Sequence, residues 1–152
     1  MLRLLFPGVI DNTFRGQWPG FWLLAPVLLA KLAIAIVSIA APRQANAADA
    51  IDLSTYSEAA LREASTSSAL LGLLHLCIGL VGVLAMIRYR AMVPFIYFWL
   101  LAEFLGRRVV LTLYPIDRVD GAASGSVINL VLISLMVSGF VLSMWPRRAA
   151  PH

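Results

Sequence analysis

The chain has 152 residues, of which 61% are hydrophobic and 13% are charged, and its mean hydropathy is +0.85. Soluble domains are about 45–50% apolar and about 25% charged, so this composition excludes an ordinary water-soluble domain and indicates an integral membrane protein. The net charge of +4 in such a protein reflects its orientation in the bilayer, and we expect no nucleic-acid partner.

Three stretches of the chain carry almost no charge and are long enough to cross a bilayer. Residues 18–41 are interrupted only by Lys31, whereas residues 65–87 and 121–145 contain no charged side chain. The last stretch ends at a proline followed by two arginines, so a helix stop coincides with an anchor at the membrane interface. These stretches predict the first, second and last membrane helices.

A further stretch, residues 93–114, has the right length but contains Glu103, Arg107 and Arg108. Its apolar side chains favour insertion by roughly 4 to 7 kcal/mol, while each charge opposes insertion by roughly 2.5 to 3.5 kcal/mol. This helix is therefore marginal by itself. With four spans, however, the arginine-rich segments fall on one side of the membrane and the acidic loops on the other, as the positive-inside rule requires.

The prediction is an all-α integral membrane four-helix bundle that forms one transmembrane domain over residues 1–152, with both termini in the cytoplasm. The predicted spans are residues 20–41, 66–87, 93–114 and 125–145, and the outer loop is residues 42–65. The segment from Ala45 to Ala47 resembles a signal-peptide cleavage motif, which leaves removal of the first span as an alternative. We expect that span to be retained, because the apolar part of a signal peptide has only about 7–15 residues.

Two segments outside the spans also carry a pattern. Residues 1–13 mix apolar side chains with Arg3, a composition suited to lying on the inner membrane surface. In the outer loop, Thr55 and Glu58 match the two ends of a capping box, which predicts a short helix over residues 56–64.

Five ionisable side chains lie inside the predicted spans, where such groups usually face other helices, a cavity or a partner. They are Lys31, His75, Glu103, Arg107 and Arg108. Counting 1.5 Å per residue from the helix ends places Lys31 and Glu103 near the same mid-bilayer level, so we expect them to pair. Arg107 is one turn from Glu103 and is expected to pair with it too, with His75 close to the Arg107 level. Arg108 is expected to extend towards the interface.

Two interpretations of this cluster stay open. A buried ion pair between Lys31 and Glu103 can fix the register of neighbouring helices, and we rank this interpretation first. With histidine neutral, however, the cluster carries an excess of two positive charges, which would attract an anion, a lipid head group or a partner's carboxylate.

The second span also carries a stripe of small residues. Gly72, Gly79 and Gly82 recur with His75 at spacings of three, four and three, so they share one helix face. Small residues let a neighbouring helix approach closely, and the stripe therefore predicts a helix-packing surface.

The sequence offers no catalytic constellation. It contains none of the HExxH, GxSxG or P-loop patterns, and its single cysteine, Cys77, excludes an intramolecular disulfide and a thiol metal site. Asp117 and Asp120 lie near a glycine, but two carboxylates in a short loop most often form a solvated turn. We expect no enzyme activity, no catalytic residue, no cofactor and no metal.

The segment from Arg88 to Pro94, followed by Glu103 and the run Gly106-Arg107-Arg108, together with residues 11–16, resembles small four-span bacterial inner-membrane proteins without an assigned activity. The resemblance covers nearly the whole chain and implies a multi-pass protein of the bacterial plasma membrane. It implies no functional residue. The expected partners are the lipid bilayer and either another protein or a second copy within the membrane.

Two functions follow from these observations. The first is a non-catalytic role in packing or assembly, or as a small accessory subunit of a membrane complex. The alternative is a small carrier, or a protein that binds an anion or lipid head group, using Lys31, Glu103, Arg107 and His75.

Overall fold

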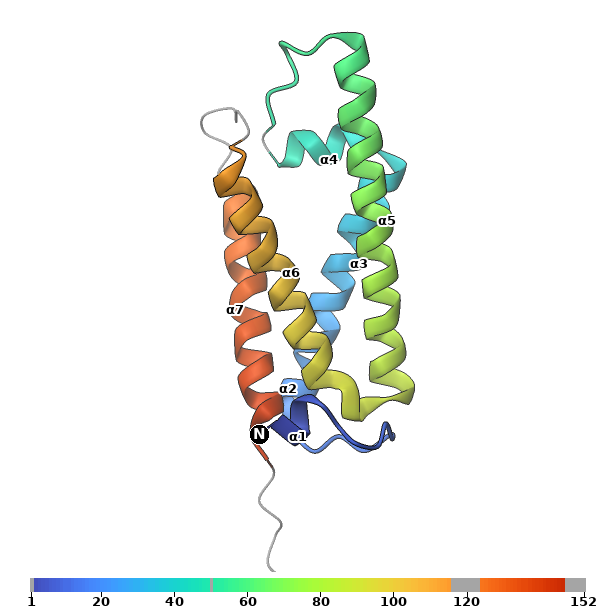
Figure 1. Ribbon diagram of the computed structural model, residues 1–152, viewed down its shortest axis with the longest axis vertical. Coiled ribbons are helices and arrows are strands. Elements are labelled where there is room, and N and C mark those ends of the chain that lie inside the picture. Colours follow the sequence, from blue (N-terminus) through green and yellow to red (C-terminus); the bar gives the residue numbers. More distant parts are fainter. Residues whose placement is uncertain (1, 50, 116–123, 147–152) are drawn as a thin grey trace, which may run out of the picture.

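The computed structural model describes residues 2–49, 51–115 and 124–146, and this part of the chain is helical and contains no β-strand (Figure 1). The elements in chain order are α1 (Leu2–Leu5), α2 (Trp18–Trp22), α3 (Leu24–Ala40), α4 (Pro42–Ala48), α5 (Glu58–Arg88), the 3₁₀ turn η1 (Arg90–Met92), α6 (Val93–Leu113) and α7 (Ser124–Met144). Among the described residues, three helical stretches are long and apolar enough to cross a membrane: Trp18–Ala40, Glu58–Arg88 and Val127–Met144. The predicted all-helical fold is confirmed for the described residues, and three of the helical stretches are compatible with a membrane protein.

The first of these stretches is interrupted where α2 gives way to α3. Pro26 lies near the start of α3 and has no amide hydrogen to donate to the carbonyl of Trp22, four residues earlier. The regular helix therefore stops at Trp22 and restarts at Leu24, which divides the single span predicted at residues 20–41 into two pieces.

The helix α5 differs from the prediction at its beginning. The short helix expected over residues 56–64 and the span expected over 66–87 form one continuous helix of 31 residues. Its N-cap is Ser57, whose hydroxyl oxygen accepts a hydrogen bond from the Ala60 amide at 3.3 Å. The expectation that Thr55 caps this helix is wrong, because Ser57 is the residue with extended backbone directly before the first helical turn.

The helix α6 begins at the predicted residue and ends at Leu113, one residue before the predicted end. Its three charged residues keep it outside the set of helices that are apolar enough to cross a membrane. Its buried residues all lie in its first half, between Val93 and Leu100, where it contacts the core. In Figure 1 it runs beside α7, away from the end of the bundle that holds α1. We call the opposite end, which holds α4 and the beginning of α5, the far end.

The apolar core lies where α2, α3, α5, α6 and α7 meet, near the end that holds the N-terminus. Its buried members are Phe21, Leu24, Val27, Leu28, Ala85, Val93, Ile96, Tyr97, Leu100 and Met136. Tyr97 is completely buried, and its hydroxyl donates a hydrogen bond to the Gly20 carbonyl at 2.9 Å. Gly139 on α7 packs directly on the Tyr97 ring, so that a β-carbon added there would overlap the phenol. The tyrosine therefore joins three helices.

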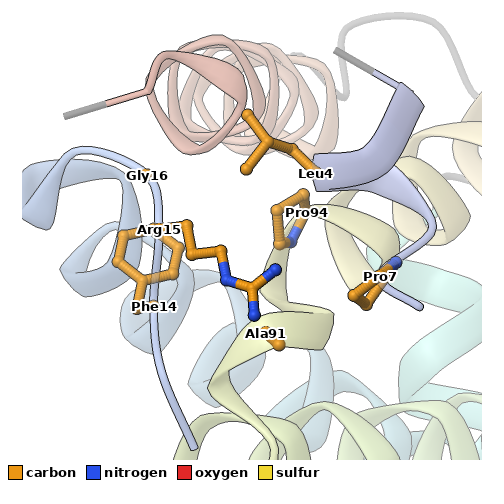
Figure 2. A pocket seen from close by; sticks show the side chains of 7 residues that line it. All are labelled: Leu4, Pro7, Phe14, Arg15, Gly16, Ala91 and Pro94. Carbon is orange, nitrogen blue, oxygen red and sulfur yellow. The ribbon is translucent and has the colours of Figure 1, made fainter. Parts of the chain in front are cut away.

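The N-terminal segment folds across the same end of the bundle. The Ala91 amide donates to the Asp11 carbonyl at 3.3 Å, and the Gln17 amide donates to the Leu142 carbonyl at 3.1 Å. Figure 2 shows the Arg15 side chain extending towards Ala91 in a small cavity of about 10 Å³, room for about one water molecule. The segment before α2 and the end of α7 are thus held together at one end.

Asp11 organises this segment through local hydrogen bonds. The Thr13 hydroxyl donates to Asp11 Oδ1 at 2.6 Å, the Thr13 amide donates to the same oxygen at 3.1 Å, and Arg15 forms a salt bridge with Oδ2 at 3.1 Å. The Thr13 hydroxyl lowers the pKa of the Asp11 carboxyl most, and the Thr13 amide and Arg15 lower it further.

Candidate functional site: an interhelical polar triad

Glu103 on α6 is bonded to side chains from two other helices. Its Oε1 lies 2.8 Å from Nε2 of His75 on α5, and its Oε2 forms an ion pair with Nζ of Lys31 on α3. We call Lys31, His75 and Glu103 the triad. The pairing of Lys31 with Glu103, predicted from their equal depth, is present in the structure.

The three members of the triad differ in burial. His75 is 5% exposed, whereas the side chains of Lys31 and Glu103 are 17% and 22% exposed. The second ring nitrogen of His75, Nδ1, is buried and has no hydrogen-bond partner among the described residues. Both carboxylate oxygens of Glu103 thus have a partner, whereas Nδ1 of His75 has none among the described residues.

Arg107 does not pair with Glu103 as expected. Its Nη2 lies 2.6 Å from Oδ2 of Asp49, the residue that ends α4. The physical reason is that both oxygens of Glu103 already have partners, while α4 brings an aspartate to the level one turn beyond Glu103. The side chains of Arg107 and Asp49 are 38% and 45% exposed, so this salt bridge contributes little to stability, about 0–1 kcal/mol.

Arg108 is exposed, and its carbonyl accepts a hydrogen bond from the Thr112 hydroxyl at 2.9 Å. Of the five predicted cluster residues, the structure thus brings three together, gives Arg107 a different partner and leaves Arg108 at the surface. When Asp49 is counted together with the five predicted residues, it neutralises Arg107, and the net charge of the group is +1 instead of +2. That charge belongs to Arg108, so the triad itself has none when His75 is neutral.

The three glycines of the predicted stripe are buried and face α3. A β-carbon added to Gly72 would lie 2.7 Å from the Ser38 Cβ and 3.0 Å from the Ala35 carbonyl oxygen. Added to Gly79 or Gly82, it would come within 2.6 Å or 2.5 Å of the end of a leucine side chain of α3. Of these three glycines, Gly72, one turn from His75, is the one whose added β-carbon would meet the α3 backbone.

A second polar link was not foreseen from the sequence. The Ser68 hydroxyl on α5 donates to Asn46 Oδ1 on α4, and the Asn46 carbonyl accepts from the Ile51 amide at 3.1 Å. Asn46 is only 4% exposed. The sequence analysis noted this residue only as the middle of a possible signal-peptide cleavage motif and predicted no contact for it. This contact holds α4 against α5 and so positions Asp49 for Arg107.

Within the described ranges, no three or more histidine, cysteine, aspartate or glutamate side chains are grouped so that they could hold a metal ion. No protein-family model, no curated protein and no solved structure matches the chain. The geometry of the triad is consequently the main guide to function.

Proposed function

We propose that the chain is a non-catalytic, multi-pass membrane protein in which the triad fixes the position of α6 against α3 and α5. It would serve in packing or assembly, as a small accessory subunit of a membrane complex. The observation that carries this proposal is the Glu103 carboxylate, whose two oxygens bind side chains from two different helices. Such buried polar contacts favour one helix arrangement over others even where they add little net stability.

The proposal includes four spans in a bacterial plasma membrane, with α6 as the third and both termini in the cytoplasm. Neutralisation of Glu103 by Lys31 lowers the cost of inserting α6, which its charges make marginal by composition. The segment before α2 is bonded to the end of α7, which fits an even number of spans. Arg15, Arg88 and Arg90 belong to this same end, as expected for the cytoplasmic side.

The length of α5 supports the same topology. Its 31 residues span about 46 Å, which exceeds the apolar thickness of a bilayer, about 30 Å. The excess lies at the polar N-terminal end, from Glu58 to about Ser65, so the far end would project from the outer surface of the membrane.

A carrier function is the second candidate, and one observation favours it. His75 Nδ1 is buried without a described partner, and Glu103 beside it is partly exposed, so a proton or ion could exchange at the triad. Four short helices rarely enclose a pathway, and a carrier would therefore require a homo-oligomer.

One set of experiments separates the two functions. We expect purification from native membranes in a mild detergent to yield a stoichiometric protein partner, and reconstituted vesicles to show no proton or anion flux. Glu103→Gln should lower the melting temperature in detergent, because the amide cannot neutralise Lys31. Asp49→Asn is the matched control, since it makes the same chemical change in an exposed ion pair. Flux that Glu103→Gln abolishes would overturn the assembly role in favour of the carrier.

A further inference from the structure

We propose that a basic hollow at the far end, between α4 and α5, binds the phosphate group of an anionic phospholipid. The hollow has a volume of about 560 Å³, within the range of about 300–1,000 Å³ typical of small-molecule sites. Its polar lining consists of Arg43, Gln44, Arg62, Ser65 and Thr66. This site lies apart from the triad and goes beyond the assembly function proposed above.

The two arginines of the hollow have no acidic partner among the described residues, a property that they share with the exposed Arg88 and Arg108. Arg15 and Arg107 are each neutralised by an aspartate, whereas neither Arg43 nor Arg62 forms a salt bridge within the described ranges. The lining holds two guanidinium groups and no carboxylate, which favours an anion inside the hollow, and Glu58 and Glu63 of α5 lie outside this lining. Because a guanidinium is planar and donates two parallel hydrogen bonds, it suits a phosphate oxygen pair.

The scaffold around the hollow is held in place by local structure. Arg62, Ser65 and Thr66 are spaced i, i+3 and i+4 and therefore share one face of α5. The bond from Ser68 to the buried Asn46 locks α4 beside that face. The Thr66 hydroxyl already donates to the Arg62 carbonyl at 2.9 Å, so the Ser65 hydroxyl and the Gln44 amide remain as neutral donors to a ligand.

The surroundings of the hollow favour a lipid over a free phosphate ion. The hollow begins directly after the last apolar turn of α3, where Ile39 is 40% exposed. One turn beyond Thr66 along α5, Leu70 is 59% exposed on the same helix face. A basic hollow with exposed apolar side chains on its membrane side matches a phospholipid, whose phosphate would lie at the arginines and whose acyl chains would cover Ile39 and Leu70.

The test measures the melting temperature of the full chain in dodecyl maltoside with three additives. These are dihexanoyl phosphatidylglycerol, dihexanoyl phosphatidylcholine at the same concentration, and inorganic phosphate at matched ionic strength. We expect phosphatidylglycerol to raise the melting temperature by several degrees more than either other additive, since a ligand that binds only the folded state stabilises it. The double variant Arg43→Gln/Arg62→Gln should lose most of this specific increase.

The matched control is Arg88→Gln/Arg108→Gln, which also removes two exposed arginine charges but leaves the hollow intact. It should retain the specific increase. Equal shifts with phosphatidylcholine, or an equal loss in the control, would overturn the proposal, and an equal shift with inorganic phosphate would replace the lipid by a free anion.

A milder variant keeps the proposal testable if the double variant does not fold. Arg62→Lys retains the charge and removes the planar fork, and it should reduce the phosphatidylglycerol-specific shift by about half. An unchanged shift in Arg62→Lys, together with an unchanged amount of phosphatidylglycerol retained in native mass spectra, would contradict a site built on guanidinium geometry.

Discussion

Gly72→Ala tests the packing of α5 against α3 at a glycine that faces the α3 backbone. The added β-carbon would lie 2.7 Å from the Ser38 Cβ and 3.0 Å from the Ala35 carbonyl oxygen. Both atoms belong to the rigid part of α3, so the helices must separate locally. Overpacking of this kind costs about 1–3 kcal/mol, while alanine favours the helix by about 0.5–1 kcal/mol over glycine. We expect a net loss of about 1–2 kcal/mol in the free energy of unfolding.

The assay is reversible unfolding in mixed micelles of dodecyl maltoside and sodium dodecyl sulfate, followed by circular dichroism. Gly106→Ala is the matched control, because a β-carbon on that glycine of α6 meets nothing within 4 Å. It should leave stability unchanged or raise it by up to about 1 kcal/mol. Gly79→Ala should fall between the two, since only the end of the Leu32 side chain must move. Equal stability of the Gly72 and Gly106 variants would refute the close approach of α3 and α5.

Three further predictions concern other contacts. Tyr97→Phe removes the buried hydrogen bond to the Gly20 carbonyl and should lower the free energy of unfolding by about 1–3 kcal/mol, because that carbonyl loses a partner; no change in the micelle assay would contradict the bond. The pKa of the Asp11 carboxyl, measured by ¹³C NMR, should lie below its ordinary value, and Thr13→Ala should raise it. Because folding lowers this pKa, the carboxylate stabilises the folded state at neutral pH and loses this effect as the pH falls through the folded-state pKa. An Asp11 pKa at its ordinary value would contradict the hydrogen bonds to Thr13. Arg107→Gln removes an exposed salt bridge and should change stability by less than about 1 kcal/mol, so a larger loss would show that this pair is shielded from solvent.

The sequence predicted the helices and one central contact because both depend on simple regularities. Apolar stretches of membrane length predicted the three helices that are long and apolar enough to cross a membrane, and proline near the start of residues 93–114 matched the beginning of α6. Lys31 and Glu103 lie at similar distances from the starts of two helices that run in the same direction, so a count of residues was enough to pair them.

Other contacts could not be predicted, because they depend on how a loop folds. Arg107 was paired with Glu103 from their spacing on one helix, whereas its partner Asp49 is brought close by α4. The position of α4 depends in turn on Asn46, whose polar contact with Ser68 has no counterpart in the sequence pattern. The composition of the outer loop showed that it is acidic, but it did not indicate that Asp49 would be the residue that pairs with Arg107.

The core contact of Tyr97 was missed for a related reason. Its neighbours, Gly20 and Gly139, come from the first and last membrane helices, far apart in the chain. A single glycine in a helix has no periodicity, so nothing in the sequence distinguishes these two from glycines in open space such as Gly106.

The most direct test of the triad is a double-mutant cycle with Lys31→Met and Glu103→Leu, measured as the free energy of unfolding in the micelle assay. Each single variant leaves a charge without its partner and should cost about 3 kcal/mol. The double variant leaves no unpaired charge of this pair and should cost at least 1 kcal/mol less than the sum of the single losses, a coupling of about the size expected for contacting residues. Losses that add to within about 0.5 kcal/mol would show that Lys31 and Glu103 do not interact, and would contradict the account of α6 as a helix held by this pair.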